Sequence, residues 1–236
     1  MRNGKSSTPP PRARLQDNLK IERIRHAFGN RDDAITSQIV EVLNRMGGVG
    51  SDAEVRYQEG LDSLRRGGAG VLSHIGELYR GLSPHAYLHR WSLVQLTSDL
   101  RDAQALPLLT EILAAPIPEE LSKRSAEYST VADETIIRTT AVEALARLAS
   151  GGNADATHVL FRQIHHASYS VRRAAVQAIL EAGDSGAREQ LRKAMPASDH
   201  HLLDLRRVRV EEVPQPHVDS RGQKRDPNSL PPRERK

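Results

Sequence analysis

A stretch of nine residues occurs three times in this chain, and this repetition limits the possible folds more than any other feature. Residues 171–179 (VRRAAVQAI) align without gaps with residues 137–145 (IRTTAVEAL) and, less closely, with residues 88–96 (LHRWSLVQL). Large apolar residues at the first, sixth and ninth places line one face of an α-helix, with a small residue at the fifth. The small side chain lets a neighbouring helix approach closely, while the large ones fill the layer between helices. We therefore expect three equivalent helices that stack on one another.

The rest of the chain between its two ends also has a helical apolar period. The low aromatic content of 3% does not suit a β-sandwich but suits helices packed through alanine and leucine. Glycine pairs, a proline and polar turns separate the segments. The period predicts helices over 35–46, 55–64, 71–79, 88–100, 106–113, 136–148, 157–164, 171–180 and 187–195. Residues 202–213 fit either a last helix or a short strand. The sequence thus predicts an all-α fold.

The nine-residue motif, following a helix and a polar turn, resembles the second helix of a HEAT repeat. It is most similar to the short bacterial form that is also found in phycobilin lyases. The resemblance covers residues 84–195, is weaker over 31–83, and treats residues 115–131 as an insertion between two repeats. It implies an α-solenoid of antiparallel helix pairs, a right-handed superhelix whose second helices line a concave binding face. HEAT motifs specify architecture more than function.

The basic charge of the chain lies in its ends. Residues 1–25 carry seven basic and two acidic residues, and residues 214–236 carry six and three, so that residues 26–213 are mildly acidic although the chain is +4. Both ends are rich in proline and polar residues, which predicts disordered tails around one helical repeat domain. Nucleic acid binding through these basic tails is one alternative function. Because the chain has no cysteine, no secretory signal and no membrane span, we expect a cytoplasmic protein.

Motifs for catalysis, metals and cofactors are weak in this sequence. His85 and His89 would share a helical face, but no third metal ligand accompanies them. The His-Glu dipeptides of HEAT-like di-iron hydroxylases are absent, and so is a phosphate-binding loop. We therefore expect no metal, no cofactor and no enzymatic activity. A phycobilin-lyase-like activity stays open because that family has no simple catalytic signature.

Basic residues recur at two places of the repeat. His89, Arg138 and Arg172 share the second place, and Arg90 and Arg173 share the third. On one interpretation they form a basic ladder on the concave face, which would bind an acidic or extended segment of a partner protein. On the other they pair with acidic neighbours or bury their stems between repeats. The first interpretation predicts a non-catalytic protein–protein interaction scaffold.

Overall fold

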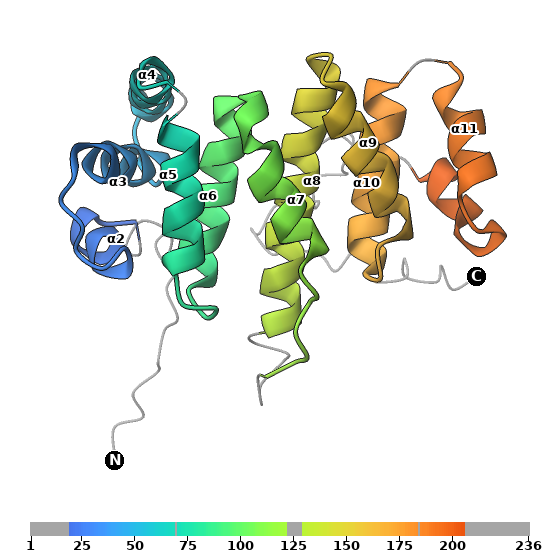
Figure 1. Cartoon of the computed structure of the whole chain (residues 1–236), viewed down its shortest axis with the longest axis horizontal. Coiled ribbons are helices and arrows are strands. Elements are labelled where there is room, and N and C mark those ends of the chain that lie inside the picture. The colour runs from blue at the N-terminus through green and yellow to red at the C-terminus, as the bar shows by residue number, and fades with distance from the viewer. Residues whose placement is uncertain (1–18, 69, 122–128, 184, 206–236) are drawn as a thin grey trace, which may run out of the picture. The chain divides into compact units, whose positions relative to one another are not determined.

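A computed structural model describes residues 19–68, 70–121, 129–183 and 185–205, and the regular structure in these ranges is entirely helical (Figure 1). The all-α prediction is therefore confirmed for this part of the chain, while the superhelix implied by the HEAT resemblance stays a prediction. The residues up to Leu203 belong to one compact unit. A second unit begins at Asp204, and of it only Asp204 and Leu205 are described.

Among the residues that the structure describes, the first half of the compact unit holds four helices, all with an apolar face turned inward. They are α2 (Ile21–Ala27), α3 (Ala34–Met46), α4 (Ala53–Arg66) and α5 (Gly70–Gly81). Helix α3 begins where the Asp33 carboxylate accepts the Thr36 backbone N–H at 2.8 Å, which satisfies one of the unpaired donors of the first turn. Helix α3 packs against α2, α4 and α5.

The predicted N-terminal tail extends too far, because helix α2 lies inside it. Leu19 and Ile24 are completely buried, and Asn44 of α3 donates to the Leu19 carbonyl at 3.0 Å. Ile21, Ile24 and Phe28 are spaced three and four residues apart, so their side chains share one helical face, although arginines separate them in the sequence. The prediction of a tail over residues 1–25 is therefore wrong for residues 19–25. The remainder of both predicted tails, and the proposed nucleic acid contacts in them, lie outside the described residues.

The second half contains the three aligned helices and the helices that precede them. Its elements are α6 (Tyr87–Leu100), η1 (Ala103–Ala105), α7 (Leu106–Ala114), α8 (Thr130–Ser150), α9 (Ala154–Arg162), η2 (Gln163–His165), α10 (Tyr169–Ala182), α11 (Ala187–Ala194) and η3 (Ala197–Asp204), where η marks a 3-10 helix. Helix α8 begins earlier than predicted, because Ser129 caps it and the Glu120 carboxylate accepts the Thr130 N–H at 3.0 Å. The described part of the predicted insertion is therefore non-helical over 115–121 and at Ser129, and helical from Thr130. The ambiguous segment 202–213 starts as part of η3, and its residues after 205 are not described.

Helices α6, α8 and α10 are the three copies of the motif, and α8 contacts both of the others. Arg90 and Glu134 pair near the starts of α6 and α8, and Asp99 and Arg147 pair near their ends. These two helices therefore run parallel. Trp91 donates its indole N–H to the Thr140 hydroxyl at 3.2 Å; both occupy the fourth place of the motif. Residues that the alignment equates thus lie side by side.

The core positions of the motif are buried as the sequence predicts. The fifth-place residues Ser92, Ala141 and Ala175 are completely buried. The sixth-place residues Leu93, Val142 and Val176 are completely buried as well. Helix α9 packs against α8 and α10, and α7 packs against α8, so the small residues lie where several helices meet.

Candidate functional site

The carboxylate of Glu134, near the start of α8, lies between two arginines. Glu134 forms ion pairs with Arg90 and with Arg138, one helical turn further along α8. The side chains of Glu134 and Arg138 are only 4% and 2% exposed. Arg90 also donates to the Tyr79 hydroxyl at 2.9 Å, which ties α5 to the same cluster. A charge this deeply buried is tolerated only when it is paired and hydrogen-bonded.

The cluster holds Glu134 in its charged form. Burial by itself raises the pKa of a carboxyl group, but the hydrogen bonds from Arg90 and Arg138 outweigh it and lower the pKa of Glu134 below its ordinary value. Burial raises the pKa of Tyr79, which therefore stays protonated. The group is an internal ion network and not a pair of titrating acids and bases.

The arginines of the motif also hold backbone segments that lie before their own helices in the chain. Arg138 donates to the carbonyls of Ala115 and Pro116 at 3.0 and 2.9 Å. Arg172 donates to the carbonyls of His166 and Ala167 at 2.9 and 3.0 Å. In the same way, Arg90 donates to the carbonyl of Pro84 at 3.1 Å. The recurrence of arginine in the motif therefore has a structural explanation: it fixes the turn before α6, the turn before α10 and, through Arg138, the segment that follows α7.

The predicted basic ladder does not form an exposed surface. Arg138 and Arg90 pair with Glu134, and Arg172 lies 3.0 Å from the Asp199 carboxylate. His89 is half-buried, and of the five predicted contact residues only Arg173 is exposed. For Arg90, Arg138 and Arg172 the structure agrees with the second interpretation, in which the arginines pair with acidic neighbours. The physical reason is that each guanidinium is drawn to the free carbonyls of the preceding turn and to an adjacent carboxylate.

Asp99 and Trp91 are likewise occupied within the fold. Asp99 accepts hydrogen bonds from Tyr57 and Arg147 at 2.9 and 2.5 Å. Burial, together with the Asp99 charge, raises the pKa of Tyr57 well above its ordinary value. Trp91 is partly buried against the core and bonded to Thr140. These contacts link α4, α6 and α8 and give Asp99 and Trp91 structural roles.

A groove of about 610 Å³ lies where the two arginine-fixed turns face each other. Its walls are residues 113–118, at the end of α7 and beyond, and residues 166–168, before α10, with Val131 of α8 between them. The volume is within the range of ligand-binding clefts, and the lining is mainly apolar. We call this feature the α7–α10 groove. The sequence analysis missed it, although Pro116-Ile117-Pro118 directly after a helix indicated an extended, apolar segment.

Two titratable groups in or next to the segments that line the α7–α10 groove, His166 and Asp133, have shifted pKa values. His166 lines the groove, and its Nδ1 accepts the Ser168 N–H at 3.0 Å. Burial and the nearby charges of Arg138 and Arg172 lower the pKa of His166. On α8, two residues beyond Val131, burial and the neighbouring charges of Glu134 and Glu120 raise the pKa of Asp133. The groove itself is therefore lined by a neutral imidazole.

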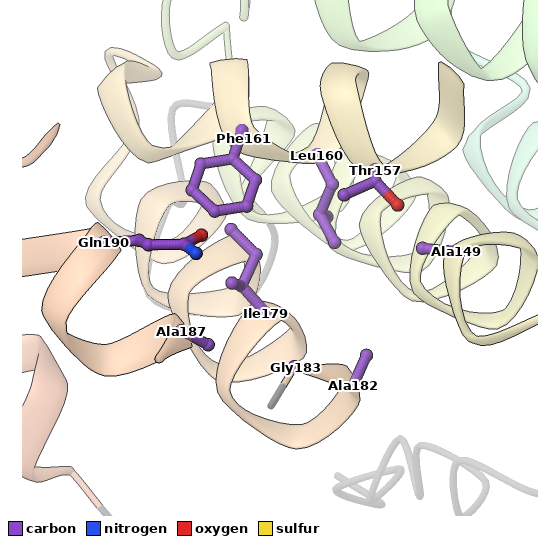
Figure 2. A pocket seen from close by; sticks show the side chains of 9 residues that line it. All are labelled: Ala149, Thr157, Leu160, Phe161, Ile179, Ala182, Gly183, Ala187 and Gln190. Carbon is purple, nitrogen blue, oxygen red and sulfur yellow. The ribbon is translucent and has the colours of Figure 1, made fainter. Parts of the chain in front are cut away.

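A second, smaller pocket of about 210 Å³ lies between α8, α9, α10 and α11 (Figure 2). Phe161 and Leu160 reach from α9 toward Ile179 of α10, while Ala149, Ala182, Gly183 and Ala187 keep the space open. Gly183 approaches α11 so closely that a Cβ atom on it would lie 2.4 Å from that of Ala187. This pocket is smaller than a typical ligand-binding site.

Comparisons with known proteins do not add a family or a function. No protein-family model, no curated protein and no solved structure matches the chain. Among the residues that the structure describes, no three histidine, aspartate or glutamate side chains are grouped to hold a metal ion. In the same part of the chain no helix has both the length and the apolar character to cross a membrane.

Proposed function

We propose that this chain is a non-catalytic, HEAT-like protein-binding module and that the α7–α10 groove is its recognition site. The observation that carries this proposal is the position of the exposed large apolar side chains. Of the six exposed large apolar side chains among the described residues, three lie within five residues in sequence of a segment that lines the groove: Leu121, Ile136 and Tyr169, which are 63%, 50% and 46% exposed. Exposed apolar side chains close to a cleft are a common feature of protein interaction sites.

The rigidity of the groove supports the same function. Arg138 and Arg172 fix the backbone of its two walls from inside, through carbonyl hydrogen bonds of 2.9 to 3.0 Å. A site that is already formed loses less conformational freedom when a partner binds, so more of the contact energy appears as affinity. An extended partner segment fits this geometry, because one wall consists of non-helical backbone with two prolines.

The expected partner differs from the acidic segment that the sequence predicts. That prediction required arginines facing solvent, and three of them are engaged with Glu134 and Asp199. The mainly apolar lining favours a segment that contributes apolar side chains. We therefore retain the extended character of the predicted partner and replace its acidic character.

The test is to fill the groove and compare the proteins that bind. Ala167→Trp places an indole on the exposed, groove-lining alanine, and Ala154→Trp makes the same change on an exposed alanine at the start of α9. The full chain and both variants are used for affinity purification from the native cell, with quantitative mass spectrometry. We expect one partner to be recovered by wild type and Ala154→Trp and lost with Ala167→Trp. Equal recovery with both variants would refute the groove as the recognition site. The absence of any specific partner would refute the proposal that the chain is a protein-binding module.

A further inference from the structure

We propose that His166 makes recognition at the α7–α10 groove dependent on pH. The neutral ring holds one wall of the groove, residues 166–168, in its folded form, and the protonated ring releases that wall. This inference rests on the proposed function, since it takes the groove as the recognition site. It also concerns the free chain, whose wall opens in mild acid whether or not a partner is present.

The wall of residues 166–168 is held by two sets of hydrogen bonds. On one side, the Ser168 backbone N–H donates to His166 Nδ1 at 3.0 Å. On the other side, Arg172 donates to the carbonyls of His166 and Ala167 at 2.9 and 3.0 Å. All three residues of the wall line the groove, so these bonds determine the shape of the site.

The bond from Ser168 exists only while His166 is neutral. A neutral imidazole has one nitrogen that accepts a hydrogen bond and one that donates, and here Nδ1 is the acceptor. A protonated ring carries a hydrogen on both nitrogens, so that Nδ1 and the Ser168 N–H would face each other as two donors. Protonation therefore removes the acceptor that closes the turn.

The charges around His166 act in the same direction. Burial and the positive charges of Arg138 on α8 and Arg172 on α10 lower the pKa of His166 below its ordinary value of 6.5. Glu134 and Asp199 pair with these two arginines, but the arginines still repel a proton on the ring. The folded wall therefore binds a proton less readily than the opened wall does.

The remaining neighbours of the ring do not offset the two arginines. The opposite wall, residues 113–118, has no titratable side chain, and Val131 between the walls is apolar. His165 of η2, which directly precedes the ring, is exposed and adds a further positive charge when it is protonated. Acid thus favours the opened wall.

Linkage gives the size of the effect. The opened wall has the ordinary histidine pKa of about 6.5, and the folded wall has a lower one. Between these two values, each pH unit shifts the balance toward the opened wall by about tenfold. A partner that binds the folded wall loses affinity by the same factor.

The first test is amide exchange at Ser168, followed by NMR in the full chain without a partner from pH 8 to 5.5. In wild type we expect protection, corrected for the intrinsic pH dependence of exchange, to fall by a factor approaching ten between pH 6.5 and 5.5. His166→Asn should remove this dependence, because an asparagine side chain accepts the N–H two residues further on and does not titrate. The matched control, His165→Asn, should respond as wild type does.

The second test uses the proteins that the full chain retains from the native cell at pH 7.5. A wash at pH 5.5 should release them from wild type and from His165→Asn, and His166→Asn should keep them. Release from all three chains alike would assign the effect of acid to the partner or to other groups, and would overturn the role of His166.

Two exchange results would also overturn the inference. The first is a change in Ser168 protection of less than about twofold in wild type, and the second is an equal fall in His166→Asn. Retention of every protein by wild type at pH 5.5 would refute the control of recognition while leaving the proposed function intact. If no protein is retained even at pH 7.5, the proposed function fails and pH-dependent recognition fails with it, whereas amide exchange still decides whether His166 opens the wall.

Discussion

Replacing Glu134 by glutamine removes the charge that Arg90 and Arg138 share while preserving the shape of the side chain. Arg138 is 2% exposed, so its guanidinium cannot turn to water when the carboxylate is lost. Removing one partner of a buried ion pair destabilises a protein by about 3 to 5 kcal/mol, because the other charge is left buried without compensation. A domain of this size is stable by about 5 to 15 kcal/mol, so Glu134→Gln should lower the free energy of unfolding by about a fifth or more.

The measurement is urea denaturation followed by circular dichroism, with Glu189→Gln as the control. Glu189 and Lys193 form a pair with the same spacing of one helical turn, but their side chains are 60% and 76% exposed. An exposed pair of this kind contributes under about 0.5 kcal/mol. A loss below about 1 kcal/mol for Glu134→Gln, or equal losses for the two variants, would refute the conclusion that the Glu134 cluster stabilises the fold.

The pH dependence provides an independent check on the same cluster. The pKa of Glu134 is lower in the folded chain than its ordinary value of 4.5. The unfolded chain therefore takes up the proton first, and the stability from this group, complete well above pH 4.5, is lost as the pH falls through that value toward the folded pKa. The difference in stability between wild type and Glu134→Gln should accordingly shrink in acid. A constant difference from pH 7 to pH 3 would contradict the assigned charge state.

Three further changes test the packing and the groove. Gly183→Ala should destabilise the chain by about 1 to 3 kcal/mol in urea denaturation, because its Cβ would lie 2.4 Å from that of Ala187. The control Gly70→Ala has open space around it and should be neutral or stabilising. A larger loss of stability for Gly70→Ala than for Gly183→Ala would disprove the close contact of α10 and α11. Trp91→Phe should lower stability by about 0.5 to 1.5 kcal/mol through loss of the hydrogen bond to Thr140, and no change would question the register of α6 and α8. Because the folded chain lowers the pKa of His166, the unfolded chain binds its proton more readily, so thermal stability should fall as the pH drops below about 6.5. This decrease should be weaker in His166→Asn, and identical pH profiles would contradict the buried, neutral state of that imidazole.

The sequence predicts the core of this fold well because the core depends on local periodicity. Ser92, Ala141 and Ala175 recur at one place of a nine-residue motif, and all three are completely buried. The same alignment places Trp91 opposite Thr140, and these two side chains form a hydrogen bond. A repeated spacing of small and large apolar residues is sufficient to identify the faces along which neighbouring helices pack.

The surface could not be predicted in the same way, because it depends on partners outside the motif. Glu134 lies ahead of the nine aligned residues, and Asp199 lies beyond the last copy, yet they decide that Arg138 and Arg172 turn inward. The α7–α10 groove depends on residues 115–118, whose backbone follows no period. The sequence shows that arginine recurs, and only the three-dimensional contacts show that its targets are carbonyls after α7 and before α10.

The shared carboxylate of Glu134 also limits how this chain can be rearranged. Arg90 belongs to α6 and Glu134 to α8, so a cut between these helices leaves Arg90 without its carboxylate and Glu134 with only one of its two arginines. Fragments ending at Leu100, duplications of a single helix pair and exchanges with unrelated helical repeats would all meet this mismatch. The copies look interchangeable in their apolar residues, but the boundary between α6 and α8 accepts only a neighbour that supplies the matching charge.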